Sequence, residues 1–166
     1  MTDLDNLKIL LNKVGSQIEE VRRTSQRKKI STRQDLVSFV PVNAGLYWIE
    51  TNMPDEEMLE AIKKTTGKDD KRMRKNRPLK IDFTKADNGI KIIYSGTRSN
   101  IQSRLLEHLF NEGNDQTGKL GCKIEDKPFS EYEWYVSYHE IEDEPVRIAI
   151  EHWWRLNIGW PPFCLR

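Results

Sequence analysis

Five polar side chains, far apart along the chain, are of the types that phosphate chemistry needs. Tyr47 and Tyr94 lie in stretches typical of β-strands, Arg104 and His108 are spaced to share one helix face, and Glu151 lies in a late helical stretch. A carboxylate can hold a hard divalent cation, and a guanidinium and a metal can offset charge on a phosphate. A phenol or an imidazole can orient or deprotonate the attacking water. Together they predict a site for phosphodiester hydrolysis.

Each of these side chains, taken singly, also has a purely structural interpretation. Tyrosines are common in strands and often pack across a sheet. Arg104 can pair with Glu107 on its own helix. Glu151 has Arg147 four residues before it and Arg155 four residues after it, which favours a helix-surface ion pair.

The remaining sequence predicts the elements that must position these residues. Residues 37–50 are typical of strand, interrupted near Pro41 and Asn43, with 45–49 as the best strand within them. Further strands are expected at residues 81–83, 90–94 and 132–141, with a hairpin turn at 87–89. Helices are expected to begin at Pro54, after Ser99 or Asn100, and at residues 142–145, the last ending before Gly159. This order predicts an α+β fold with a small, mostly antiparallel sheet.

An N-terminal helix is expected over residues 3–24, because apolar residues recur there at steps of three and four: Leu4, Leu7, Leu11, Val14, Ile18 and Val21. A basic, extended connection follows. We therefore expect residues 1–35 to form this helix and connection, and residues 36–166 to form the main domain, with an insertion at 52–89. A helix packed on the domain is the favoured interpretation, and an arm that dimerises or grips DNA is the alternative.

Residues 63–80 form a strongly basic run. They hold nine basic residues against two acidic ones. A solvated loop and a loop that contacts nucleic-acid phosphates are equally compatible with this composition, since phosphate contacts release counterions without reading bases. The candidate nucleic-acid-binding residues are Lys68, Lys71, Arg72, Arg74, Lys75 and Arg77 here, together with Arg98.

The overall composition points to a soluble protein with a charged surface. The chain has 166 residues and a formal net charge of +1, which neither requires nor excludes a nucleic-acid partner. Cys122 and Cys164 are too few for a metal cluster and predict free thiols in a reducing compartment. Charged residues interrupt the N-terminal segment, unlike in a signal peptide, and no apolar run approaches the roughly 20 residues of a membrane span. We expect a cytoplasmic protein.

The combination of motifs resembles the GIY-YIG nuclease superfamily. The motif residues are Gly45-Leu46-Tyr47 and Tyr94-Ser95-Gly96, followed by Asn100-Ile101, Arg104-Leu105 and His108, and later by Ala149-Ile150-Glu151. The resemblance covers roughly residues 44 to 166. It implies a three-stranded antiparallel sheet flanked by helices, and metal-dependent hydrolysis of nucleic acid, usually DNA.

By match of position, the resemblance also implies roles for the five residues. Tyr47 would lie nearest the attacking water and could be the general base, and Tyr94 would orient the water or the phosphate. Arg104 would contact the scissile phosphate, His108 would support that contact or assist proton transfer, and Glu151 would hold Mg²⁺ or Mn²⁺. The expected function is a restriction- or homing-like DNA endonuclease. RNA is not excluded as a target, and a homo-oligomer would suit cleavage of both strands at a palindrome.

Three features depart from the family pattern. Ser95 replaces an aliphatic residue, 46 residues separate Tyr47 from Tyr94, and Cys164 stands where the family often has an asparagine after Pro161-Pro162-Phe163. The missing asparagine favours a second hypothesis, a non-catalytic nucleic-acid-binding module with a decayed site. A third, a protein-interaction scaffold, would use the acidic run at 140–144 and the N-terminal helix.

Overall fold

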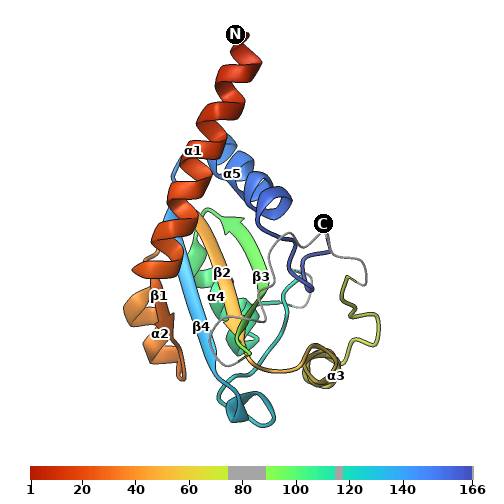
Figure 1. The fold of residues 1–166 in the computed structure, drawn as a ribbon. Helices are drawn as coiled ribbons and strands as arrows, with labels where there is room; N and C mark the ends of the chain where they lie inside the picture. Colours follow the sequence, from red (N-terminus) through yellow and green to blue (C-terminus); the bar gives the residue numbers. More distant parts are fainter. Residues whose placement is uncertain (75–88, 115–117, 166) are drawn as a thin grey trace.

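Helices cover both faces of one antiparallel sheet in this α+β protein (Figure 1). The computed structural model describes residues 1–74, 89–114 and 118–165. The strands lie in the order β1-β4-β2-β3, and all three pairs are antiparallel. In chain order the elements are α1 (Asp3–Thr24), β1 (Arg27–Lys29), α2 (Arg33–Phe39), β2 (Gly45–Thr51), α3 (Asp55–Thr66), β3 (Lys91–Arg98), α4 (Ile101–Phe110), the 3-10 turn η1 (Phe129–Glu131), β4 (Trp134–Glu140) and α5 (Glu144–Asn157).

The predicted α+β fold with an antiparallel sheet and an N-terminal helix is confirmed, but the strand count implied by the resemblance is wrong. A fourth strand, β1, pairs with β4 where the sequence predicted a solvated basic connection. Arg27 is anchored rather than solvated, because its Nε lies 2.8 Å from Glu50 Oε2 and its guanidinium lies 3.9 Å from the Tyr135 ring, whereas Lys28 and Lys29 are exposed. Long cationic side chains can cover a sheet edge while their stems pack.

The structure also corrects the segment just before β2. Residues 37–39 were expected to be strand but form the end of the short helix α2. A capping box begins this helix, because Thr32 accepts from the amide of Asp35 while the Asp35 carboxylate accepts from the amide of Thr32. Leu36, which belongs to this helix, is fully buried. The predicted strand at 81–83 lies outside the described residues.

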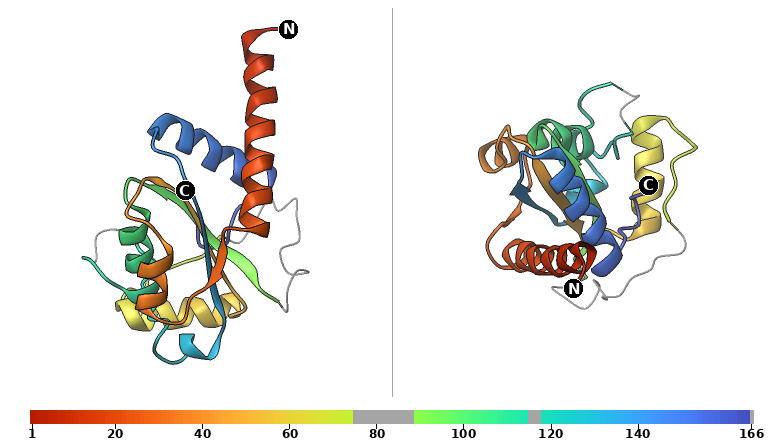
Figure 2. Two further views of the ribbon diagram at one scale, coloured as in Figure 1. Left: turned by 90° about the vertical axis from the view of Figure 1, so that its left-hand side faces the viewer. Right: turned by 90° about the horizontal axis from the view of Figure 1, so that it is seen from above.

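Helix α1 has the predicted bounds, but only its second half packs on the domain. Ile18 is buried, whereas Leu4 and Leu7 are 77% and 50% exposed. Figures 1 and 2 show the first half of the helix projecting beyond the rest of the molecule. The apolar stripe that the sequence predicted is therefore continuous along the helix but buried over only part of its length.

A buried polar network anchors the second half of α1. Arg22 donates to Glu19 at 2.6 and 2.8 Å, and Glu19 also accepts from the Trp154 indole of α5 at 2.6 Å. Gly15 allows the Trp153 ring to lie against the helix backbone. The contacts hold α1 and α5 together over one face of the sheet, as seen in Figure 2.

The two faces of β2 separate the two cores. Tyr47 and Ile49 belong to the larger core under α3 and α4, while Leu46 and Trp48 belong to the smaller core under α1 and α5. This alternation follows from the two-residue period of a strand. Every residue of β2 is buried, so Tyr47 is fixed at the centre of the sheet. No helix within the described ranges is long and apolar enough to span a bilayer.

Candidate active site

A chain of hydrogen bonds links Tyr47 to the backbone through His108. The Leu120 amide donates to His108 Nδ1 at 3.0 Å, and His108 Nε2 lies 3.1 Å from the Tyr47 hydroxyl. Because Nδ1 accepts a hydrogen bond, a neutral imidazole must carry its proton on Nε2. His108 therefore donates to Tyr47, and Leu120 sets the tautomer that makes this possible.

The environment keeps His108 neutral. Its side chain is fully buried, and this burial, reinforced by the positive charges of Arg104, Lys71 and Arg98, holds its pKa well below the usual 6.5. A charged imidazole would also lose the hydrogen bond from Leu120, since both ring nitrogens would then be donors. In this arrangement His108 acts as a hydrogen-bond donor to Tyr47.

The buried neutral His108 should make folding stability depend on pH. The unfolded chain takes up a proton near pH 6.5 and the folded chain does not, so the free energy of unfolding should fall as the pH is lowered below about 6.5, approaching about 1.4 kcal/mol per pH unit from this group. His108→Gln should flatten that dependence in urea unfolding measured at about pH 5.5 and pH 7.5, on either side of the ordinary histidine pKa. His152→Gln, at an exposed position, is the matched control. An unchanged slope in His108→Gln would contradict the assignment.

Tyr94 completes an aromatic cluster with Tyr47 and His108. The two tyrosine rings are nearly parallel, 10° apart with centroids at 6.2 Å, and the Tyr94 ring lies 4.4 Å from the imidazole. Tyr94 is half-buried, whereas Tyr47 is 2% exposed. The cluster therefore meets the protein surface through Tyr94.

Arg104 brings a positive charge to both phenols. Its pairing with Glu107, one of the expected structural alternatives, is present, and its positive charge also acts on both phenols, where it lowers the pKa of Tyr47 and of Tyr94 against the larger effect of burial. The side chain is 8% exposed. The i, i+4 spacing on α4 thus places Arg104 and His108 on the same phenol, as the sequence suggested.

Burial controls the ionisation of the two phenols. It raises the pKa of Tyr47 well above 10, and the opposing effect of Arg104 is smaller. The pKa of Tyr94 is raised for the same main reason, with a further contribution from Cys164. Both hydroxyls are therefore protonated at neutral pH in the free protein, and the Tyr47 oxygen accepts a hydrogen bond from His108.

Glu151 approaches β3 from the opposite face of the sheet. Tyr94 and Gly96 lie on the phenol side, while Ser95 between them points toward α5, where Arg155 donates to its hydroxyl at 3.2 Å and its carbonyl at 2.6 Å. Glu151 Oε1 lies 2.6 Å from Arg155. The structure thus brings four of the five predicted residues together and joins Glu151 to the same stretch of β3 through Arg155.

Only one backbone strand separates Glu151 from the phenol. Both Glu151 and Tyr47 line a narrow gap, too small to hold a water molecule, that also touches Gly96. Glu151 is 9% exposed, so its carboxylate does not face bulk solvent, and burial raises its pKa despite the neighbouring Arg155. The carboxylate is held in place by the ion pair.

The side chains near the phenols allow only one kind of divalent-ion site. Magnesium is commonly held by one or two carboxylates together with water and substrate phosphates. Glu151 supplies one carboxylate, and no group of three His, Cys, Asp or Glu side chains suited to a metal occurs in the described ranges. The residues therefore fit a site with one protein ligand, in which the ion would compete with Arg155 for the carboxylate.

Cys164 forms hydrogen bonds with the backbone of β3. Its Sγ lies 3.2 Å from both the amide nitrogen and the carbonyl oxygen of Ser95, accepting from the first and donating to the second. A thiol combines one donor with an acceptor, as an asparagine amide does. Cys164 therefore ties the C-terminal segment to the edge strand beside Tyr94. Both cysteines are free thiols, as expected, and both are buried.

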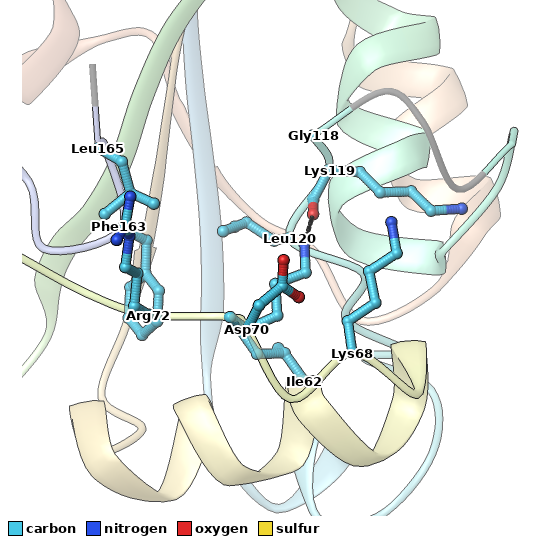
Figure 3. Close-up of a pocket in the computed structure, with 10 residues that line it drawn as sticks. Ile62, Lys68, Asp70, Arg72, Gly118, Lys119, Leu120, Phe163 and Leu165 are labelled. Carbon is cyan, nitrogen blue, oxygen red and sulfur yellow. Dashed lines mark hydrogen bonds between the residues drawn. The ribbon is translucent and has the colours of Figure 1, made fainter.

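The predicted nucleic-acid-binding residues divide into separate groups. Lys68, Lys71 and Arg72 line a pocket of about 740 Å³ between α3 and residues 118–120 (Figure 3). Arg74 instead stacks 4.3 Å from the Trp160 ring, and its amide donates to the Pro162 carbonyl at 2.7 Å, so it fixes the C-terminal segment.

The other predicted nucleic-acid-binding residues do not line this pocket. Arg98 is exposed at the end of β3, opposite Gly45 in the sheet register. Lys75 and Arg77 lie outside the described residues. Within the described residues, the basic run therefore does not form a single surface.

Three contributors to the site were missed from the sequence. The Leu120 amide sets the His108 tautomer, Arg155 holds Glu151, and Gly96 leaves room for the Tyr47 hydroxyl. The first is a backbone group and has no sequence signal. Arg155 was seen only as one possible partner of Glu151, and Gly96 only as part of a motif.

Comparison with known proteins supplies no further assignment. Searches of protein-family models, of curated proteins and of solved structures find no match to this chain. The indications of chemistry in this chain are therefore the positions and contacts of Tyr47, Tyr94, Arg104, His108 and Glu151.

Proposed function

We propose that this protein is a divalent-metal-dependent endonuclease that hydrolyses phosphodiester bonds in DNA, in the manner of restriction or homing enzymes. The observation that carries the proposal is the ordered chain of hydrogen bonds from the Leu120 amide through His108 to Tyr47, with the positive charge of Arg104 acting on the same phenol. A core phenol needs one partner to be satisfied. The His108 donor and the guanidinium charge of Arg104 are together suited to stabilising negative charge on that oxygen.

The proposed division of roles follows from these contacts. Arg104 binds the scissile phosphate and offsets the charge that develops on it, since a buried guanidinium acts more strongly than one in water. Tyr94, at the surface of the cluster, orients the phosphate. Tyr47 orients the attacking water, and the His108 donor stabilises its oxygen if the phenol proton is lost. The Nε2–H tautomer favours this supporting role for His108 over acceptance of a proton from Tyr47.

Glu151 is the proposed metal-holding residue. A bound Mg²⁺ or Mn²⁺ would lower the pKa of water and neutralise phosphate charge. Arg155 positions the carboxylate beside Ser95 until the ion competes for it. The metal requirement is thus tied to one side chain.

A plasmid-cleavage assay tests the proposal. The purified chain should nick or linearise plasmid DNA with Mg²⁺ or Mn²⁺, and EDTA should abolish the reaction. Glu151→Gln, which keeps the shape of the side chain, should remove the metal-dependent cleavage while circular dichroism shows an intact fold. Equal cleavage by parent and variant would remove Glu151 from the mechanism.

The second candidate is a nucleic-acid-binding module without catalysis. The specific observation in its favour is the short ion pair of Glu151 with Arg155, which engages the carboxylate that a metal would need. This candidate predicts salt-sensitive DNA binding that is lost when the basic run from Lys71 to Arg77 is neutralised, with no cleavage in any metal. The same plasmid assay therefore separates the two.

A further inference from the structure

The largest pocket among those described joins cationic and apolar walls. Its volume is about 740 Å³. Figure 3 shows Lys68 and Lys119 at one end and Arg72 beside Phe163 at the other, with Ile62 of α3 beneath. Such a combination suits a ligand that has both an anionic group and an apolar or aromatic part.

Positive charge dominates the lining. It contains the cations Lys68, Lys71, Arg72 and Lys119 and a single acidic residue, Asp70. The pKa of Lys71 is lowered by burial and by the neighbouring Lys68, an effect that Asp70 only partly offsets. A group of like charges in a concave site attracts an anion, which would relieve their mutual repulsion.

The polar contacts of the cluster hold it in place. Lys119 is 4% exposed, and its ammonium donates to the carbonyls of Asn111, Glu112 and Gly113 at 3.0 to 3.1 Å, at the C-terminal end of α4. Lys71 in turn donates to the Lys119 carbonyl. The positive end of the pocket is thereby attached to the helix that carries Arg104 and His108.

The pocket also shares its inner wall with the tyrosine site. Leu120 lines the pocket, and its amide is the group that bonds to His108. Phe163 lines it too, and the next residue, Cys164, contacts Ser95 beside Tyr94. Lys71 is close enough to contribute to the lowered pKa of His108. A strand bound at the tyrosines would therefore continue beside the pocket.

We propose that this pocket binds a nucleotide unit of the DNA strand next to the scissile bond, with its phosphate at Lys68, Lys71 and Arg72 and its sugar and base against the apolar wall. The inference rests on the proposed function, because it takes the tyrosine site as the place where the strand is cleaved. It adds a substrate-positioning site that contacts the strand away from the reacting phosphate.

Binding can be measured separately from cleavage. The test uses Tyr47→Phe as the parent, which keeps the pocket intact, and a fluorescein-labelled duplex oligonucleotide read by anisotropy at several salt concentrations. Adding Lys68→Gln and Arg72→Gln should raise the Kd about tenfold and make the salt dependence less steep by about one to two in the log–log slope. The matched control, Lys64→Gln with Lys127→Gln, removes the same charge outside the pocket lining and should change the Kd less than about twofold.

Each possible result of this test either supports or overturns the assignment of the pocket to the DNA strand. Equal effects of the pocket pair and the control pair would reduce the result to net charge and overturn the proposal, as would unchanged DNA binding by the pocket pair. Competition by a nucleoside monophosphate, lost in the pocket pair without any effect on oligonucleotide affinity, would assign the pocket to a free nucleotide and also overturn it. If the pocket pair alone weakens DNA binding while the wild-type chain never cleaves, the pocket is a DNA-binding site, but the nuclease proposal and the position beside a scissile bond both fail.

Discussion

Tyr47→Phe should lower the rate of DNA cleavage by about 10²- to 10⁴-fold, the range expected when a group that handles the attacking water is removed. The change deletes a single oxygen and leaves the buried ring in place. That oxygen is the partner of His108 Nε2, and the positive charge of Arg104 acts on the same phenol.

The same substitution should cost some stability, because His108 Nε2–H loses its acceptor in a fully buried site. An unsatisfied buried donor costs about 1–3 kcal/mol, which urea unfolding can measure. The rate should therefore be compared at a temperature well below both unfolding midpoints. Binding of the oligonucleotide should change little, so that the loss falls on the rate at saturating DNA.

Tyr138→Phe is the matched control for Tyr47→Phe. Tyr138 lies on β4 directly opposite Tyr47 in the register and packs against the same core. Because the hydrogen bonds that His108 and Arg104 make within the described part of the chain do not involve Tyr138, the cleavage rate of this variant should remain within about twofold of the parent. Equal losses in both variants would mean that the effect is structural, and an active Tyr47→Phe would remove Tyr47 from the chemistry.

Local sequence signals predicted the helices well where those signals determine where a helix begins. Helix α1 begins at a Thr2 capping box, and α5 begins after Asp143 with proline in its first turn; both signals are visible in the sequence. The strand β1 was not predictable in this way, since three basic residues have little strand preference. Its pairing depends on a distant partner strand and on Glu50.

The site was predictable in part for the same reason. Arg104 and His108 share a face because helix geometry requires it, and the two tyrosines stack because β2 and β3 pair. Whether Glu151 lies on the phenol side of the sheet depends on how α5 packs, which no local pattern encodes. The role of Cys164 depends on the path of the C-terminal segment back to β3. Both features depend on tertiary packing and not on the local sequence.

Gly96→Ala should abolish the ordered tyrosine site through sterics alone. A Cβ placed on Gly96 would overlap the Tyr47 hydroxyl oxygen and lie 2.6 Å from Cζ of the same ring. Since Tyr47 is held by a fully buried strand, the phenol must move away from His108 or the edge strand must shift. We expect cleavage to fall at least about a hundredfold and the free energy of unfolding to fall by about 1–3 kcal/mol, as in other overpacked cores.

A double-mutant cycle identifies the cause. Tyr47→Leu removes the hydroxyl oxygen and Cζ that the new Cβ would meet, so Gly96→Ala should cost much less stability in that background than in the parent, with an interaction energy of about 1–2 kcal/mol. Gly45→Ala is the matched control, because its Cβ would instead overlap the His139 carbonyl oxygen. Its cost should be the same in both backgrounds. If the cost of Gly96→Ala persists beside the shorter leucine side chain, the glycine serves the path of β3 rather than the phenol, and the requirement for glycine in this motif is then independent of catalysis.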